Sequence, residues 1–172
     1  MSLLKIGSEK MKNIGYTELY EKIYTLLGDT TSLKADCGVL CGRRCCSGSD
    51  DKGMLLFPGE TSALEVKESG GRRLAVCNGK CDRSTRPVSC MLFPFFPTVD
   101  KNGKIKVELD YRGVSVCPLI SNSESVAFDR KFLKNTLKAG KLLAKNEECR
   151  RFLEEITDEI TQAKELYMKL CK

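Results

Sequence analysis

Ten cysteines and no histidine among 172 residues constrain this chain more than any other feature of its sequence. The absence of histidine excludes a Ser-His-Asp triad, a Cys-His dyad, a histidine-bearing zinc protease motif and an imidazole pH switch. Any bound metal must therefore take thiolates, carboxylates or backbone and water oxygens as ligands. Eight of the cysteines lie in one stretch: Cys37, Cys41, Cys45, Cys46, Cys77, Cys81, Cys90 and Cys117.

The spacing of these eight cysteines indicates chelation rather than simple burial. They follow the pattern C-x3-C-x3-C-C, then C-x3-C-x8-C, then a single cysteine further on. Closing a short loop between two ligands costs little chain entropy, whereas hydrophobic burial requires no such grouping. We expect most of these thiols to cluster in space as metal ligands. Zinc is the first candidate, and iron or an iron–sulfur cluster is the alternative.

The adjacent pair Cys45-Cys46 limits how one ion could be held. Neighbouring side chains point in different directions in a turn or an extended backbone. The pair therefore indicates two metal centres, a bridging thiolate, or one ligand beside one packed thiol. The spacing differs from those of ferredoxins and from the C-x3-C-x2-C motif of radical enzymes that use S-adenosylmethionine. That difference favours a mononuclear site.

Disulfide bonds are the main alternative for an even number of cysteines. The first twenty residues contain no apolar segment typical of a secretory signal. No run approaches the ~18 apolar residues that a membrane span needs. We therefore expect a cytoplasmic protein, in which many cysteines indicate metal binding or catalysis rather than disulfides.

The last two cysteines stand apart from the group. Cys149 lies on the apolar stripe of a predicted C-terminal helix, which favours a buried small hydrophobic residue, although it could approach a site from the helix start. Cys171 is the penultimate residue, and we expect a thiol at a frayed helix end.

Arginines accompany the cysteine blocks, where their charge could offset that of thiolates; an ordinary surface position is an equal alternative. The formal net charge of +6, from 29 basic and 23 acidic residues, suggests an anionic partner. Eight thiolates on two divalent ions would lower it to +2. We expect no nucleic-acid partner and no membrane partner, and leave a protein partner open. The arginines are Arg43, Arg44, Arg83 and Arg86.

Hydrophobic periodicity predicts a single domain over residues 1–172 with an α+β fold. A helix is predicted over 14–28, and two more over 124–171 that pack as a hairpin or as one bent rod. Between them, the Cys-rich region 36–119 should form a small irregular unit, organised by metal and packed against the three helices. Its short strands are predicted over 54–57, 63–67, 72–77 and 104–111, and its prolines exclude a regular helix within 81–97.

Three segments of this region resemble a known family. They read CGVLCGRRCC (37–46), FPGE (57–60) and RPVSCMLFP (86–94). They are similar to segments of the bacterial CxxCxxCC-type zinc- or iron-chelating proteins (YkgJ-like), over roughly residues 36–119. The resemblance implies that seven cysteines are ligands, and Cys117 completes eight by spacing. This chain departs from the family pattern in having three residues, not two, between its first cysteines. The seven are Cys37, Cys41, Cys45, Cys46, Cys77, Cys81 and Cys90.

The resemblance implies metal binding but identifies no reaction. A related cysteine cluster in flagellin lysine methylases keeps an enzyme open by analogy alone. The sequence contains no Gly-rich nucleotide loop. Three functions follow: a structural zinc domain that scaffolds an interaction surface, an iron–sulfur or redox enzyme or methyltransferase accessory, and a metal-handling protein that releases its ion.

Overall fold

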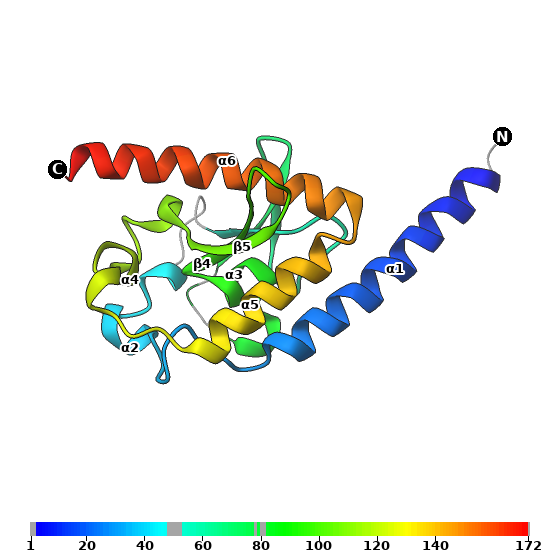
Figure 1. Ribbon diagram of the computed structural model, residues 1–172. Coiled ribbons are helices and arrows are strands. Elements are labelled where there is room, and N and C mark those ends of the chain that lie inside the picture. The colour runs from blue at the N-terminus through cyan, green and yellow to red at the C-terminus, as the bar shows by residue number, and fades with distance from the viewer. Residues whose placement is uncertain (1–2, 48–52, 78, 80–81, 172) are drawn as a thin grey trace.

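The computed structural model describes residues 3–47, 53–77, 79 and 82–171, with side chains from residue 15 onward. It confirms an α+β fold (Figure 1). The helices are α1 (Leu3–Leu27), α2 (Gly38–Cys41), α3 (Val88–Leu92), α4 (Pro118–Ser121), α5 (Arg130–Leu143) and α6 (Glu147–Leu170). The strands are β1 (Gly53–Leu55), β2 (Val66–Ser69), β3 (Arg72–Val76), β4 (Phe95–Val99) and β5 (Ile105–Leu109). Single 3-10 turns cover Arg44–Cys46, Arg83–Thr85, Tyr111–Gly113 and Ser123–Ser125.

The strands form two separate antiparallel sheets. One has the order β1-β3-β2, and the other is the β4–β5 hairpin. Met54 pairs with Ala75 in the first sheet, and Phe96 pairs with Glu108 in the second. Four strands overlap the predicted ones, but β4 was not predicted. Its first four residues are all buried, so it lacks the polar–apolar alternation that marks a half-buried strand.

The prediction that prolines exclude a regular helix within 81–97 is wrong. The short helix α3 fits between two of them, with Pro87 at its N-cap and Pro94 beyond its end. A proline is tolerated at a helix start because the first N–H groups have no partner within the helix. Pro97 lies within β4, a strand of a two-stranded sheet, where a missing ladder donor is tolerated.

Two of the three long helices cover the β4–β5 hairpin, and the third packs on one of them. α1 packs on α5, while α5 and α6 both pack on β4 (Figure 1). The expected helical hairpin or bent rod is therefore wrong, because α5 and α6 enclose a strand between them. Gly140 of α5 permits this approach: a Cβ at that position would lie 2.4 Å from the Pro97 Cβ.

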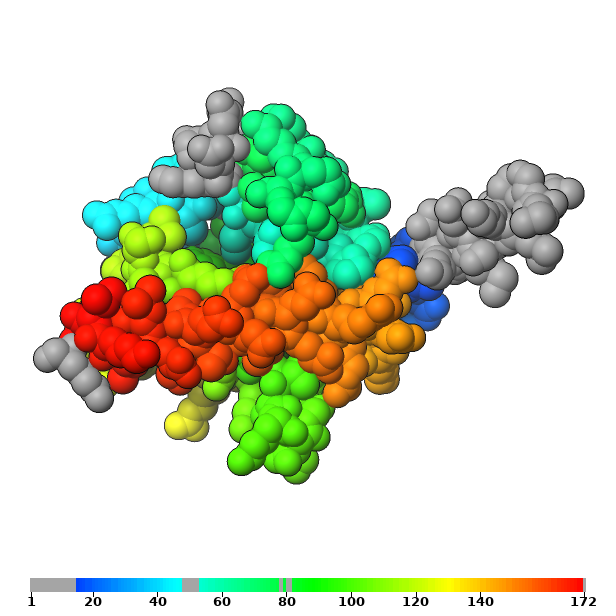
Figure 2. Space-filling model, turned by 90° about the horizontal axis from the view of Figure 1, so that it is seen from above, coloured from blue at the N-terminus to red at the C-terminus, as the bar shows by residue number. Residues whose placement is uncertain are grey.

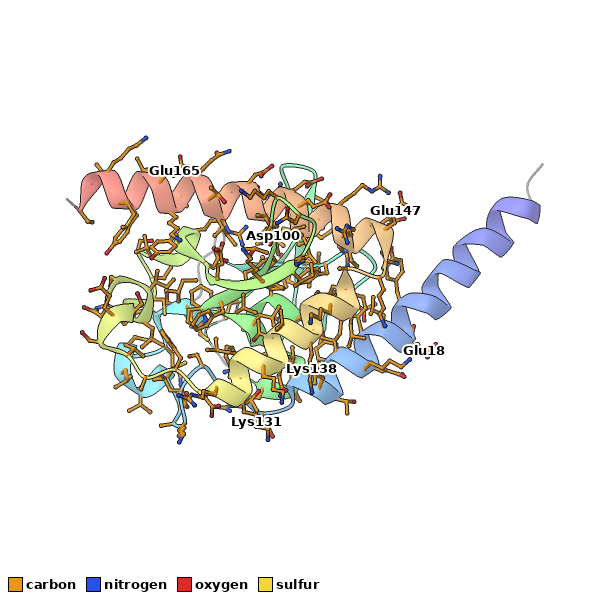
Figure 3. The ribbon with its side chains drawn as sticks, viewed as in Figure 1. Glu18, Asp100, Lys131, Lys138, Glu147 and Glu165 are labelled. Carbon is orange, nitrogen blue, oxygen red and sulfur yellow. The ribbon has the colours of Figure 1, made fainter. Side chains whose placement is uncertain are left out.

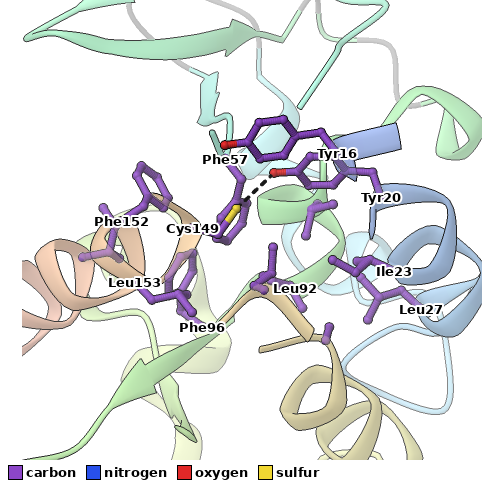
Figure 4. Packing of buried hydrophobic residues seen from close by; sticks show 14 of the residues in the cluster. Tyr16, Tyr20, Ile23, Leu27, Phe57, Leu92, Phe96, Cys149, Phe152 and Leu153 are labelled. Atoms are coloured by element: carbon purple, nitrogen blue, oxygen red, sulfur yellow. Dashed lines mark hydrogen bonds between the residues drawn. The ribbon is translucent and has the colours of Figure 1, made fainter. Parts of the chain in front are cut away.

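The main hydrophobic core lies where α1, α3, β4 and α6 meet (Figure 4). Phe57 is fully buried at its centre, with ring centroids 5.7 Å from Phe96 and 5.0 Å from Phe152. Tyr20 of α1 is also buried there. The periodic apolar residues of the predicted helices supply most of this core, as their spacing indicates.

The charged side chains surround this core. Glu18 and Glu147 lie at the edge of the molecule in Figure 3. Figure 2 shows α6 across one face, with the β2–β3 and β4–β5 hairpins projecting on opposite sides of it. None of the helices among the described residues is long and apolar enough to cross a membrane.

Candidate metal centre

The first three cysteines of the group are brought together by two tight helical turns. Cys37 is the N-cap of α2, Cys41 is its last residue, and Cys45 lies in the 3-10 turn that follows. Gly42 and Arg43 between them adopt left-handed backbone, with φ of 60° and 56°. This pair of left-handed residues ends α2 and turns the chain. The C-x3-C-x3-C spacing thus corresponds to one helical turn, a reversal and a second turn.

A fourth cysteine reaches the same place from a distant segment. Cys117 is the N-cap of α4 and is buried. Together with Cys37, Cys41 and Cys45 it lines a cavity of about 20 Å³, whose other walls are mostly apolar. Phe93 and Pro94 form one wall, and this Phe-Pro step comes from the RPVSCMLFP segment. The term thiol tetrad is used below for Cys37, Cys41, Cys45 and Cys117.

Three of the tetrad thiols, those of Cys37, Cys45 and Cys117, have a raised pKa, mainly because burial disfavours the thiolate. Burial raises the pKa of Cys117 to about 11, and proximity to Cys41, Cys37 and Cys45 adds to the rise. Burial also raises the pKa of Cys37, with Asp36 and Cys41 adding to it. Four thiols with no histidine among them form a soft donor set, which suits zinc or an iron–sulfur cluster.

A second set of cysteines adjoins the tetrad. A cavity of about 60 Å³ is lined by Cys46 and Cys90 together with Cys37 and Cys45 of the tetrad. The Cys45 and Cys46 sulfurs are 3.9 Å apart, and the Cys77 thiol lies 3.4 Å from the Cys46 carbonyl oxygen. Cys45 lines both cavities, whereas Cys46 lines only the second. The double cysteine therefore faces two adjoining spaces. Cys81, predicted as a ligand, lies outside the described residues.

An acidic residue gathers two of the four predicted arginines beside the tetrad. Asp36 accepts a hydrogen bond from the Gly38 amide at 3.0 Å, at the start of α2. Its carboxylate also pairs with Arg43 at 3.3 Å and with Arg83 at 3.6 Å. Arg86 lines the second cavity. These three arginines lie beside the cysteines, whereas Arg44 faces a different cavity, described below.

A buried carboxylate joins two of the segments that carry the family resemblance. Glu60 of FPGE is 1% exposed and accepts hydrogen bonds from the Phe57 amide at 3.0 Å and the Val88 amide at 2.7 Å. The Tyr24 hydroxyl donates to it at 2.8 Å. Val88 begins α3, which carries Cys90, so Glu60 fixes this helix to the turn at 57–60. The sequence alone indicates no role for Glu60, because its burial depends on partners that are distant in sequence.

The two remaining cysteines lie away from the tetrad. Cys149 is fully buried in the helical core, as predicted, with its sulfur 3.6 Å from the Tyr20 hydroxyl oxygen (Figure 4). Cys171 is exposed at the end of α6, also as predicted. No disulfide joins any two of the nine cysteines that the structure describes.

The tetrad has the donors of a metal site without the final geometry of one. Within the described ranges, no group of three or more cysteine or carboxylate side chains is already arranged to hold a metal ion. The four thiols nevertheless share one small cavity, and cysteine side chains move between staggered rotamers. Thiolates are donors that zinc prefers, so the donor chemistry of the tetrad fits zinc.

Comparison with models of known protein families, with curated proteins and with solved structures finds no match to this chain. The similarity to CxxCxxCC-type proteins therefore stays a prediction that rests on the three segments and their contacts.

Proposed function

We propose that this protein binds a metal ion, zinc in the first place, through the thiolates of the tetrad Cys37, Cys41, Cys45 and Cys117. The main support for this proposal is that the local C-x3-C-x3-C segment and the distant Cys117 line one cavity. Between Cys45 and Cys117 the chain passes through both sheets. Bringing four thiols together from such separate segments is expected of a chelating site and is not required by hydrophobic packing.

The charges around the tetrad support this function. Four thiolates on one divalent ion carry a net charge of −2, which a buried site must balance. Arg43 and Arg83, paired through Asp36, and Arg86 near the second cavity place positive charge next to it. Such groups stabilise thiolates and orient ligands. Binding would release the thiol protons, so affinity should fall as the pH falls.

The test is elemental analysis of protein purified without oxygen, with single cysteine variants. We expect about one zinc per chain from the tetrad. Cys41→Ser and Cys117→Ser should lose most of that metal. Cys171→Ser, which removes an exposed thiol at the chain end, is the matched control and should retain it. Full metal content in both tetrad variants would refute the proposal.

Cysteine variants at the second cavity test whether the protein holds one metal ion or two. If Cys46, Cys77 and Cys90 bind a separate ion, Cys90→Ser should remove one equivalent and leave the tetrad's metal in place. If Cys45 bridges two ions, Cys45→Ser should remove both. If the purified protein is brown and absorbs visible light, the same ligands hold an iron–sulfur cluster and not zinc. Release of metal to a chelator without loss of fold would favour metal handling over a structural role.

A further inference from the structure

A much larger cavity lies directly beside the tetrad. Its volume is about 480 Å³, within the range of about 300–1,000 Å³ that is typical of small-molecule sites. It shares Cys45, Phe93 and Val116 with the small thiol cavity, so these three residues separate the two spaces. Cys45 is an exposed residue and lines the large cavity, so a molecule bound there would lie against it.

The wall of this cavity is mainly apolar. Met54 and Leu55 of β1, Phe96 of β4, and Phe93 and Val116 line it. Ser89 also lines it, but the Ser89 hydroxyl is occupied by a 2.6 Å hydrogen bond to the Leu55 carbonyl oxygen. The cavity can therefore take an apolar molecular body, while the remaining polar side chains decide which charged group that body carries.

Two arginines line the cavity, and their charges are not equivalent. Arg112 donates to Asp110 at 2.9 and 2.7 Å and to Glu159 at 2.9 Å, and its guanidinium lies over the Phe96 ring. Two carboxylates thus neutralise Arg112 and hold it in place.

Arg44 differs in both respects. Arg44 is exposed, and no ion pair or hydrogen bond joins its guanidinium to any other residue that the structure describes. Asp110 also lines the cavity and is paired with Arg112. Among the described residues of the cavity wall, Arg44 is therefore the charged side chain that no ion pair compensates.

We propose that this cavity binds a small organic anion, with an apolar body against Met54, Leu55 and Phe96 and a single carboxylate, sulfonate or phosphate on Arg44. The ligand would lie against Cys45 and thus next to the metal. That last point rests on the proposed function, whereas the cavity and its charge do not. An isolated arginine binds such a group by charge-assisted hydrogen bonds.

The test uses a matched pair of fluorescent probes. 8-Anilinonaphthalene-1-sulfonate is an anion with an apolar body, and N-phenyl-1-naphthylamine is its uncharged analogue. We expect the anion to bind the folded protein more tightly than the analogue. Arg44→Gln should weaken the anion about tenfold, the loss expected for one charge-assisted bond, and should leave the neutral analogue unchanged. Arg130→Gln removes an equal charge from an exposed arginine that does not line the cavity, and it should alter neither probe.

A second variant tests the position of the ligand. Ser115 lines the cavity and is exposed, so Ser115→Trp should fill the space without disturbing the core and should abolish binding of both probes. Equal effects of Arg44→Gln and Arg130→Gln would overturn the proposal, as would equal affinity for the two probes. Unchanged binding in a folded Ser115→Trp protein would also overturn it.

The link to the metal has a separate readout. In protein loaded with cobalt(II), the anion should change the visible d–d absorption of the thiolate-bound ion, and in Arg44→Gln the same change should require about ten times more anion. If the chain takes up no metal, the proposed function fails, but the probe titrations on the metal-free protein still decide on the cavity. If metal binds and the anion does not, only this further inference fails.

Discussion

Two cysteines of this protein are both buried but have different neighbours. Cys117 belongs to the region around the thiol tetrad, called the thiol region below, and is 7% exposed. Cys149 lies in the helical core and is 0% exposed. Burial raises the pKa of each to about 11. Cys117 shares a cavity with three other thiols, whereas Cys149 contacts the Tyr20 hydroxyl and the Pro58 carbonyl oxygen.

The comparison teaches that neither burial nor pKa separates a proposed ligand cysteine from a cysteine of the hydrophobic core. What distinguishes Cys117 is the chemistry of its neighbours, which are other soft donors. The two regions should therefore respond to different perturbations. The helical core depends on apolar area removed from water, and the thiol region depends on the proposed metal.

Metal removal is the perturbation with the largest expected effect. Structural zinc sites contribute an apparent binding free energy of about 10–16 kcal/mol near neutral pH. Chelation should expose the amides of residues 36–47 and 114–121 to hydrogen exchange and leave α5 and α6 protected. The same segments should lose protection as the pH falls, since protons compete with the ion for thiolates. Equal protection of both regions after complete metal removal would show that the metal does not organise the fold.

Truncation of the core aromatic should have the next largest effect. Phe57→Ala removes a fully buried ring that stacks on Phe96 and makes a tilted contact with Phe152. We expect a loss of about 3–5 kcal/mol in the free energy of unfolding, measured by urea denaturation. Leu166→Ala on the exposed side of α6 is the control, since Leu166 is 60% exposed; it should change stability by less than about 0.5 kcal/mol. Similar losses in the two variants would contradict the assigned core.

The buried carboxylate that joins the two regions should have an intermediate effect. Glu60→Gln replaces one carboxylate oxygen by an amide NH₂, which faces either the Phe57 amide alone or both the Val88 amide and the Tyr24 hydroxyl. We expect a loss of about 1–3 kcal/mol at neutral pH for the unsatisfied donor. Glu21→Gln, at an exposed position of α1, should be neutral.

Glu60 also gives a pH dependence with a definite sign. Burial raises the pKa of Glu60, opposed by its hydrogen bonds and by Arg73. The folded protein therefore retains this proton at pH values where the unfolded chain has lost it. Stability from this group is fully present below the unfolded pKa of about 4.3 and falls as the pH rises through the folded pKa. In Glu60→Gln, the free energy of unfolding should not fall in this way as the pH rises. Urea denaturation of both proteins at several pH values measures the difference.

The smallest effect is expected for the core cysteine. Cys149→Ala removes one buried sulfur and should cost about 1–2 kcal/mol. It should leave the metal content unchanged, because Cys149 lies outside the thiol cavity. Cys171→Ala should be neutral in both measurements. Loss of metal in Cys149→Ala would remove the distinction between the two regions.

The presence of the long helices could be predicted from the sequence because the signal is local, although α1 begins at Leu3 and not near residue 14. The apolar stripe and Gly28 predict the end of α1 at Leu27, and Gly28 adopts a left-handed φ of 50°. The stripe of the last helix likewise predicts the burial of Cys149. Neither α3 nor β4 was predicted, because prolines dominate that segment and β4 does not alternate.

The sequence by itself determined the composition of the candidate site. Grouped thiols without histidine restrict the donor set, and the C-x3-C-x3-C spacing places three sulfurs on consecutive turns. Only the tertiary structure decided that Cys117 joins these three and that Glu60 fixes α3. It also decided that Arg44 faces a separate apolar cavity. The physical reason is that sequence spacing specifies geometry over one or two turns. Contacts across two sheets instead depend on how the packed core places distant segments.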